Sequence, residues 1–203
     1  MIYDFENRTI QVKIVYYGPA MSGKTTSLKY LFSVFGKQEN LSSIESSVGR
    51  TLFFDFGVLK FQGSNWGLKF LMYSATGQDF YAGTRPATLN GVDGIIFVAD
   101  SQKELLEDNL RSWNELKMLF GLEFYDMPIV IALNKCDLKK GNTIEKEELM
   151  TLFNLNELDS IKMHKTTATK GLGILDSFKK LVGFIFPQLA INLESVNTSH
   201  FSK

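Results

Sequence analysis

The segment from Gly18 to Thr25 (Gly-Pro-Ala-Met-Ser-Gly-Lys-Thr) has the spacing Gly-x4-Gly-Lys-Ser/Thr, which is suited to binding phosphate groups. Glycines let backbone N–H groups curl around phosphate oxygens, and a helix that begins at such a loop adds the positive end of its dipole. We expect Lys24 to neutralise the β- and γ-phosphates of a nucleotide and the Thr25 hydroxyl to bind Mg²⁺. The motif predicts these nucleotide-binding residues: Gly18, Ala20, Met21, Ser22, Gly23, Lys24, Thr25 and Thr26.

A second motif, Asn134-Lys135-Cys136-Asp137, directly follows the apolar run of residues 128–133 and is suited to binding a guanine base. The Asp137 carboxylate can accept hydrogen bonds from N1–H and from the 2-amino group of guanine, whereas adenine has no donor at N1. Mismatched buried polar groups of this kind support discrimination of about 10⁴–10⁵-fold. We expect Asn134 to brace the loop and meet the purine, and the stem of Lys135 to lie along the ring.

A third and weaker element for binding the base follows the last predicted strand, residues 160–166. It consists of Thr167, Ala168 and Thr169. We expect the backbone N–H groups of these residues to contact the base, although an ordinary strand-to-helix turn would have a similar composition.

Short β-branched runs alternate with stretches of helical periodicity along the chain. The predicted strands are 10–17, 51–59, 69–73, 92–99, 128–133 and 160–166, and the predicted helices include 24–35, 106–120 and 173–186. This pattern predicts an α/β fold with a six-stranded, mostly parallel sheet, one antiparallel strand and helices on both faces. Together with the motif of residues 18–25, it predicts a fold of the P-loop NTPase type. We expect one domain over residues 1–187, a polar tail over 188–203, and a long loop over 37–50 that is a candidate switch.

The composition excludes several classes of protein. The 203 residues include 22 Lys and Arg against 22 Asp and Glu, and this balance argues against binding nucleic acid through neutralised phosphates. The single cysteine cannot form an internal disulfide. Because the sequence lacks a signal peptide, a long apolar span and the usual lipidation motifs, we expect a cytoplasmic protein without a direct membrane anchor.

The order of these elements resembles the Ras-like small GTPase superfamily over nearly the whole chain. Residues 51–56 (Thr-Leu-Phe-Phe-Asp-Phe), Gly77-Gln78 followed by Phe80-Tyr81, and residues 91–102 are similar to the MglA-type prokaryotic small GTPases, the branch linked to polarity and gliding motility. The resemblance implies a switch that binds GTP or GDP with Mg²⁺ and hydrolyses GTP, slowly without an activating partner.

The resemblance also implies roles for residues in the two switch segments, 37–50 and 77–86. Thr51 closes over Mg²⁺ and the γ-phosphate in the GTP-bound state, and both segments rearrange when GTP is hydrolysed. The N–H of Gly77 meets the γ-phosphate, and Gln78 positions the attacking water.

An arginine that neutralises charge in the transition state is a further feature implied by the family. Arg50, just before Thr51, is similar to the family's intrinsic arginine finger, and Arg85 is the alternative. The catalytic residues expected on this basis are Gln78, Arg50, Lys24 and Thr51.

The sequence departs from the superfamily pattern at two positions. Ser74 replaces an Asp that in most relatives orients the Mg²⁺ shell, and MglA-type proteins also lack this Asp. Asp55 or Asp100 could replace its charge through water. Ala20 stands where many relatives carry glycine, and its methyl group could crowd Gln78 and slow hydrolysis.

Three functions follow from these residues. We expect a GTPase switch, with a non-hydrolysing scaffold that binds guanine nucleotides as the alternative motivated by Ser74 and Ala20. An ATP-using kinase would need a lid over its acceptor, for which the chain has little room.

The resemblance implies a homodimeric roadblock-type activating protein at the switch segments, where outward-facing phenylalanines of the 51–73 hairpin would form the docking edge. We expect the chain alone to be monomeric, and the sequence does not name a downstream effector.

Overall fold

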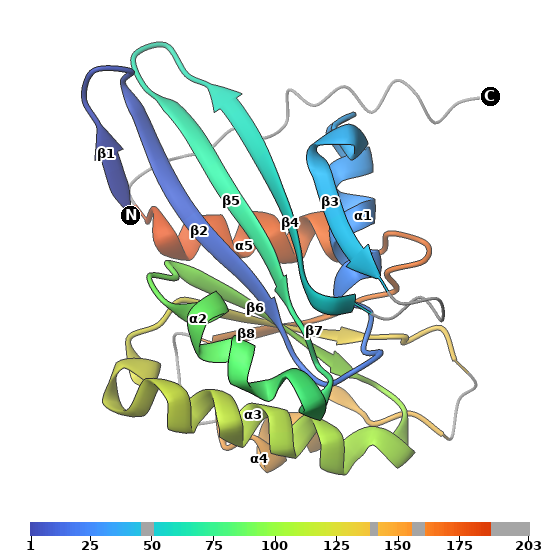
Figure 1. Cartoon of the computed structure of the whole chain (residues 1–203). Helices are drawn as coiled ribbons and strands as arrows, with labels where there is room; N and C mark the ends of the chain where they lie inside the picture. The colour runs from blue at the N-terminus through green and yellow to red at the C-terminus, as the bar shows by residue number, and fades with distance from the viewer. Residues whose placement is uncertain (46–50, 139–141, 156–160, 188–203) are drawn as a thin grey trace, which may run out of the picture.

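The computed structural model describes residues 1–45, 51–138, 142–155 and 161–187, which form an α/β fold (Figure 1). The strands are β1 (Ile2–Asp4), β2 (Thr9–Tyr17), β3 (Leu41–Glu45), β4 (Thr51–Gln62), β5 (Gly67–Ala75), β6 (Gly94–Asp100), β7 (Ile129–Asn134) and β8 (Ile161–Lys165). The α-helices are α1 (Lys24–Val34), α2 (Arg85–Leu89), α3 (Leu106–Phe120), α4 (Lys146–Leu152) and α5 (Ile174–Ile185). Within the described residues, 3₁₀ turns are η1 (Gln38–Asn40), η2 (Asp79–Thr84), η3 (Lys103–Leu105) and η4 (Gly121–Tyr125).

The sheet has the strand order β3-β4-β5-β2-β6-β7-β8, and β1 pairs with β2 beside this path. The pairs from β5 through β2, β6 and β7 to β8 are parallel, whereas β4 is antiparallel to β5 and β3 is antiparallel to β4. Because β5 and β6 lie on opposite sides of β2, the chain changes direction of winding at β2. In parallel α/β sheets, ligands bind outside the carboxyl ends of the strands at this kind of switch point.

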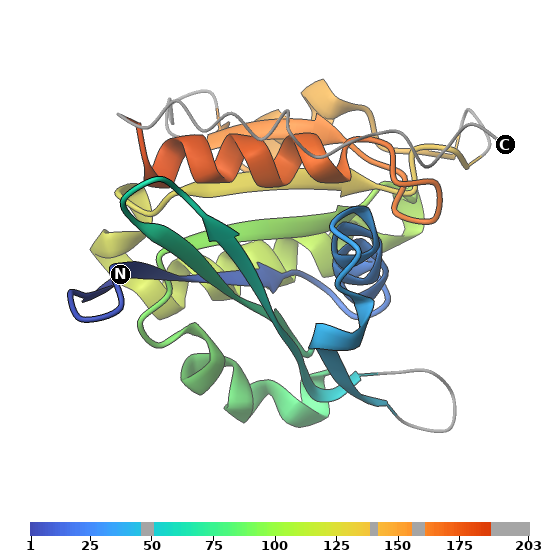
Figure 2. The same ribbon diagram turned by 90° about the horizontal axis from the view of Figure 1, so that it is seen from above.

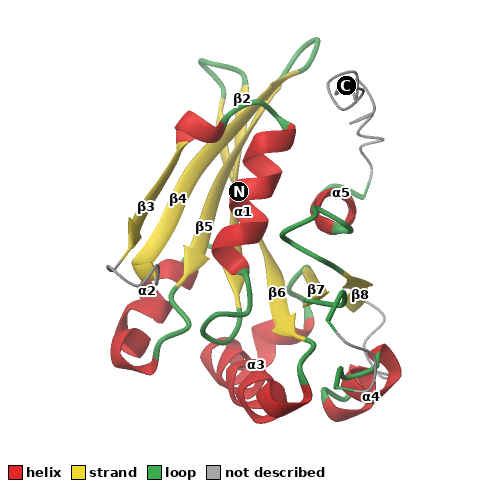
Figure 3. Ribbon diagram, turned by 90° about the vertical axis from the view of Figure 1, so that its right-hand side faces the viewer, coloured by secondary structure: helices red, strands yellow, loops and turns green. Residues whose placement is uncertain are grey.

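Helices cover both faces of the sheet. One core cluster packs α1 and α5 against the sheet, and a second packs α3 and α4 against the opposite face. Figure 2 shows α5 and α2 on opposite sides, and Figure 3 shows the same separation with α1 and α5 on one side. Strands β6 and β7 are buried along their whole length, which is the physical reason that their sequences are continuous apolar runs.

The second core is built around Trp113 of α3. Its ring stacks on Phe153 at 4.7 Å between ring centroids and makes edge contacts with Phe97 and Phe124. The indole N–H donates a hydrogen bond to the Phe153 carbonyl at 3.3 Å, so the one polar atom of this buried side chain is satisfied. The Phe153 residue follows α4, and its contact with Trp113 therefore joins α3 to the α4 region.

The α/β class, the mostly parallel sheet and the helices on both faces are confirmed, and α3 has the predicted bounds. In the part of the chain that the structure describes, the sheet contains eight strands rather than six, because β1 and β3 were not predicted. The prediction of a loop over residues 37–50 is wrong for residues 38–45, since η1 and β3 occupy them and β3 pairs with β4. Residues 46–50 lie outside the described residues, as does the predicted tail 188–203.

The two hairpin turns β1–β2 and β4–β5 lie at the same end of the sheet (Figure 1). The ring of Phe5 in the first turn contacts Trp66 in the second, with 5.6 Å between ring centroids. This end is opposite to the carboxyl end of β2, so these two aromatic rings lie far from the predicted phosphate loop. Within the described ranges, no helix is long and apolar enough to cross a membrane.

We expect Trp113→Ala to lower the free energy of unfolding by about 3–5 kcal/mol, because the change leaves a cavity among three aromatic rings and removes the indole donor from the Phe153 carbonyl. Urea denaturation followed by circular dichroism measures the effect. Trp66→Ala is the matched control, because Trp66 is only half-buried at a turn. A smaller loss for Trp113→Ala than for Trp66→Ala would contradict this assignment of the core.

Candidate nucleotide-binding site

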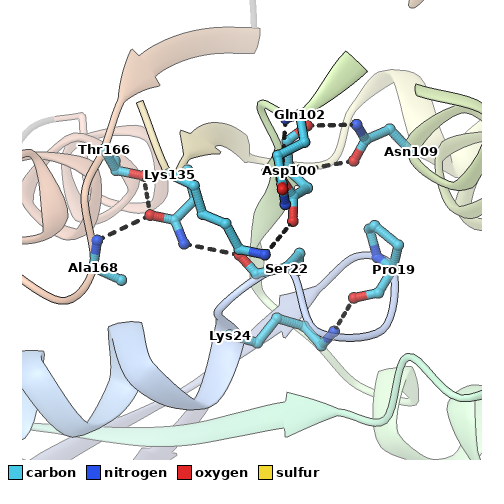
Figure 4. Close-up of polar contacts among 10 residues, drawn as sticks. Pro19, Ser22, Lys24, Asp100, Gln102, Asn109, Lys135, Thr166 and Ala168 are labelled. Carbon is cyan, nitrogen blue, oxygen red and sulfur yellow. Dashed lines mark hydrogen bonds and ion pairs between the residues drawn. The ribbon is translucent and has the colours of Figure 1, made fainter. Parts of the chain in front are cut away.

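The sequence-predicted motifs lie together at the carboxyl ends of the parallel strands. Gly18 follows β2, Asp100 ends β6, Asn134 ends β7, and Thr167 follows β8. Figure 4 shows the side chains from these strand ends converging. The sheet therefore brings the phosphate-binding and base-binding motifs, more than 100 residues apart in the sequence, to one edge.

The backbone of the phosphate loop requires glycine at two positions. Gly18 and Gly23 have φ angles of 139° and 102°, in the region that favours glycine. A side chain at Gly18 would lie 2.3 Å from the carbonyl oxygen of Val98, so the loop packs directly on β6. The loop ends at the start of the 11-residue helix α1, whose first-turn N–H groups and dipole favour an anion.

The loop lysine is buried. Lys24 is 6% exposed, and its Nζ donates to the carbonyl oxygens of Gly18 at 2.9 Å and Pro19 at 2.6 Å (Figure 4). Burial, with a further contribution from the positive charge of Arg85, lowers the pKa of Lys24 to about 7, although Asp55 opposes the shift. A phosphate anion at this position would favour the charged form of the ammonium group.

The residues around Thr25 fit a magnesium ion. The Thr25 hydroxyl donates to Oδ2 of Asp55 at 2.6 Å, and Asp55 is fully buried on β4. Asp55 pairs across the strands with Ser74 on β5, the position at which the resemblance to Ras-like GTPases implies an Asp. The carboxylate is thus supplied from the neighbouring strand. A hydroxyl and a carboxylate oxygen are the hard oxygen ligands that Mg²⁺ prefers, the remainder coming from water and nucleotide phosphates.

Asp100, the other candidate to replace the Asp that is absent at Ser74, contacts the predicted base-binding motif. Its Oδ2 forms an ion pair with Nζ of Lys135 at 2.5 Å, and its Oδ1 accepts hydrogen bonds from Gln102. Asn109 of α3 holds the backbone N–H and carbonyl of Asp100 at 2.9 and 2.8 Å (Figure 4). Between the two carboxylates, the geometry therefore favours Asp55 for the magnesium shell and gives Asp100 to Lys135.

Asn134 braces the two motifs against each other. Its Nδ2 donates to the Ser22 carbonyl at 2.8 Å, and its Oδ1 accepts from the Thr166 hydroxyl and the Ala168 N–H at 3.2 and 2.9 Å. Gly23 leaves room for this amide, since a side chain there would lie 2.2 Å from Nδ2. The phosphate loop, the base loop and the segment after β8 are thereby held together by one buried side chain.

Asp137, the predicted base reader, forms an ion pair with Lys170 at 3.0 Å. The hydrogen bond from Lys170 lowers the pKa of Asp137, so the carboxylate is charged and acts as an acceptor. Lys170 was not predicted as a site residue. The only signal in the sequence is its place one residue after Thr169, and that position has no chemical meaning until the fold brings it to Asp137.

The Gly77-Gln78 pair lies directly against the phosphate loop. A side chain at Gly77 would lie 2.3 Å from the backbone nitrogen of Ala20, so the two segments are in close contact. The Gln78 N–H donates to the hydroxyl of Thr76 at 3.3 Å. Ala20 and Gln78 therefore come from adjoining segments, and crowding of Gln78 by the Ala20 methyl group stays a hypothesis.

The remaining predicted residues differ in exposure, and two of them lie wholly or partly outside the described residues. Met21, Thr26 and Thr169 are exposed at the same edge, whereas Thr167 is buried and its N–H donates to the Leu172 carbonyl at 3.0 Å. Arg50 lies outside the described residues. Thr51 begins β4, and its side chain also lies outside the description.

Comparison with known proteins agrees with this geometry. The sequence pattern of the ADP-ribosylation factor family matches residues 1–185. The chain belongs to this family of small GTPases. It is 37% identical over 193 residues to the mutual gliding-motility protein MglA of Myxococcus xanthus (strain DK1622), covering 92% of this chain and 96% of that protein. The predicted Ras-like, MglA-type relationship is confirmed.

Two further relatives are eukaryotic. The GTPase is 30% identical to ADP-ribosylation factor-like protein 6 of Caenorhabditis elegans over 174 residues, 84% of each chain. It is 27% identical to the GTP-binding nuclear protein GSP1 of Encephalitozoon cuniculi (strain GB-M1) over 165 residues, 80% of this chain and 72% of that protein. The family supports a protein that binds guanine nucleotides and acts as a switch.

We expect Lys24 to make the stability of the nucleotide-free GTPase depend on pH. Its pKa in the folded chain, about 7, is below the ordinary value of 10.5, so the unfolded chain binds more protons between these values. The free energy of unfolding should therefore rise with pH, by about 1.4 kcal/mol per pH unit at pH 8–9.5 from this group alone.

Urea denaturation at several pH values tests this expectation. Lys24→Met should remove that part of the slope, whereas Lys29→Met, at an exposed position on the same helix, should keep it. Equal slopes for Lys24→Met and the unchanged chain would show that Lys24 has an ordinary pKa.

Proposed function

We propose that the protein is a molecular switch that binds GTP or GDP with Mg²⁺ and hydrolyses GTP to GDP and phosphate. The observation that carries this proposal is the link from Asn134 to Ser22, which fixes a guanine-type loop next to a phosphate loop. A site with both loops would select a ligand that carries both a guanine base and a nucleotide's phosphate groups. The small GTPase family supports the same activity.

Mg²⁺ would be held by the hydroxyls of Thr25 and Thr51, with Asp55 orienting its water ligands. The bound ion would neutralise charge on the β- and γ-phosphates. Asp55 is suited to this role because its Oδ2 already accepts a hydrogen bond from Thr25 at 2.6 Å. Ion binding would displace that hydrogen bond in favour of a shared water shell.

Hydrolysis would use residues from the segments that meet at Gly77. We propose that Gln78 orients the attacking water in line with the leaving group, and that the Gly77 N–H and Lys24 hold the γ-phosphate. The contact of Gly77 with Ala20 supports this placement. Arg50 would neutralise the charge that develops on the phosphate oxygens, since it directly precedes Thr51 in the sequence.

Partner binding would follow the nucleotide state. We propose that segments 37–50 and 77–86 change conformation on hydrolysis and that a homodimeric activating protein of the roadblock type docks there. Phe56 is only half-buried against Tyr73, with 4.8 Å between ring centroids, and so offers apolar surface beside the switches. Phe70 belongs to the core, and Phe61 packs partly against it, so neither serves this edge.

A scaffold that binds GTP without hydrolysing it is the second candidate, favoured by Ser74 and Ala20. Single-turnover phosphate release from GTP and from ATP, with Mg²⁺, decides between the two. We expect release from GTP and not from ATP, and Gln78→Leu should lower the rate by at least about 10-fold because water is no longer oriented. Tight GTP binding without release, even with an activating protein added, would establish the scaffold.

Base recognition has its own test in Asp137→Asn. An amide at this position can accept from N1–H and donate to the 2-carbonyl of xanthine, whereas it faces the 2-amino group of guanine with a donor. We expect affinity for GDP to fall by at least about 100-fold and affinity for xanthosine diphosphate to rise, as measured by equilibrium binding. Glu145→Gln is a suitable control, because Glu145 is paired with Lys165 and lies outside the proposed base contacts. An unchanged preference for GDP would exclude Asp137 as the base reader.

A further inference from the structure

Arg85, the first residue of α2, has a buried guanidinium group directly behind the catalytic segment. The side chain is 6% exposed. Its Nε donates to the Thr76 carbonyl at 3.0 Å, and its Nη1 forms an ion pair with Oε2 of Glu115 at 2.5 Å. Arg85 thus bridges the end of β5 and the middle of α3.

Thr76 is the residue through which this bridge reaches Gln78. It immediately precedes Gly77, its carbonyl accepts from Arg85, and its hydroxyl accepts the N–H of Gln78 at 3.3 Å. Thr76 is 2% exposed, so these two contacts are sheltered from water. A shift of the Thr76 carbonyl would therefore move the backbone that carries Gln78.

The other end of the bridge is a rigid part of the fold. Glu115 lies on α3 between Trp113 and Leu116, both fully buried in the second core. Tyr17, which directly precedes Gly18, has Glu115 and Arg85 as its charged neighbours. The guanidinium group therefore lies where the start of the phosphate loop, the end of β5 and α3 meet.

We infer that Arg85 is a positioning residue, which ties the Gly77-Gln78 segment to α3 and so sets the place of Gln78 relative to the phosphate loop. The inference rests on the proposed GTPase function. It differs from the expectation that Arg85 is the alternative arginine finger, because its guanidinium group is engaged behind the segment by Thr76 and Glu115.

The chemistry of the pair requires arginine and a carboxylate. A planar guanidinium group donates in two fixed directions, to the carbonyl and to the carboxylate, whereas the ammonium group of lysine is a single point of charge. Arg85→Lys should therefore keep the charge and lose one of the contacts. Glu115→Gln keeps the shape of the side chain and removes only its charge.

Single-turnover GTP cleavage at saturating nucleotide tests the inference. We expect both variants to cleave GTP at least about 10-fold more slowly, with the dissociation constant for GDP changed by less than about 2-fold. The Arg85→Lys/Glu115→Gln double variant should be no slower than the slower single variant, because both changes break one bridge. Glu107→Gln, an exposed position on the same helix, should leave the rate and affinity unchanged.

Rates like those of the unchanged chain would overturn the inference, and so would a parallel loss of GDP affinity, which indicates a general structural role. If the unchanged chain binds GTP and does not cleave it, the proposed hydrolysis fails. Amide hydrogen exchange of the GDP-bound chain then decides on Arg85 independently. We expect exchange at residues 76–84 to be at least about 10-fold faster in Glu115→Gln than in Glu107→Gln, and equal exchange would overturn the inference.

Discussion

The buried ammonium group of Lys24 is the constraint around which the site is built. A cation removed from water needs acceptors close by, and the loop provides them by turning the Gly18 and Pro19 carbonyls inward. That turn requires a left-handed glycine backbone packed against β6. The same turn leaves the N–H groups at the start of α1 directed towards a ligand. The loop, the lysine and the start of the helix are therefore suited together to binding an anion.

Most of the fold could be predicted because its signals are local. The buried strands β6 and β7 are continuous apolar runs, and α3 has an apolar stripe that ends at Gly121, whose φ is 54°. Strand β3 has no comparable signal, because Leu-Ser-Ser-Ile-Glu becomes a strand only by pairing with β4. The three-residue strand β1 likewise depends on its neighbour β2.

The site could be predicted as far as its motifs extend, and no further. The phosphate and base loops are contiguous segments, so their residue types and spacing are visible in the sequence. The contacts of Asp137 with Lys170 and of Arg85 with Glu115 join residues 30 or more positions apart, and only the fold brings them together. The choice between Asp55 and Asp100 depended on strand register, since pairing of Asp55 with Ser74 places a carboxylate beside Thr25.

Because Asn134 joins the phosphate loop to the base loop, a nucleotide in the proposed site would contact both loops at once. Because the base and phosphate subsites are fixed relative to each other, binding one end of the nucleotide presents the other at a high effective concentration. Free guanine or inorganic phosphate would make only one of the two sets of contacts. Each would still pay the full entropy cost of losing translational freedom on binding. Under the proposed function, the site would therefore bind the intact nucleotide more tightly than either fragment.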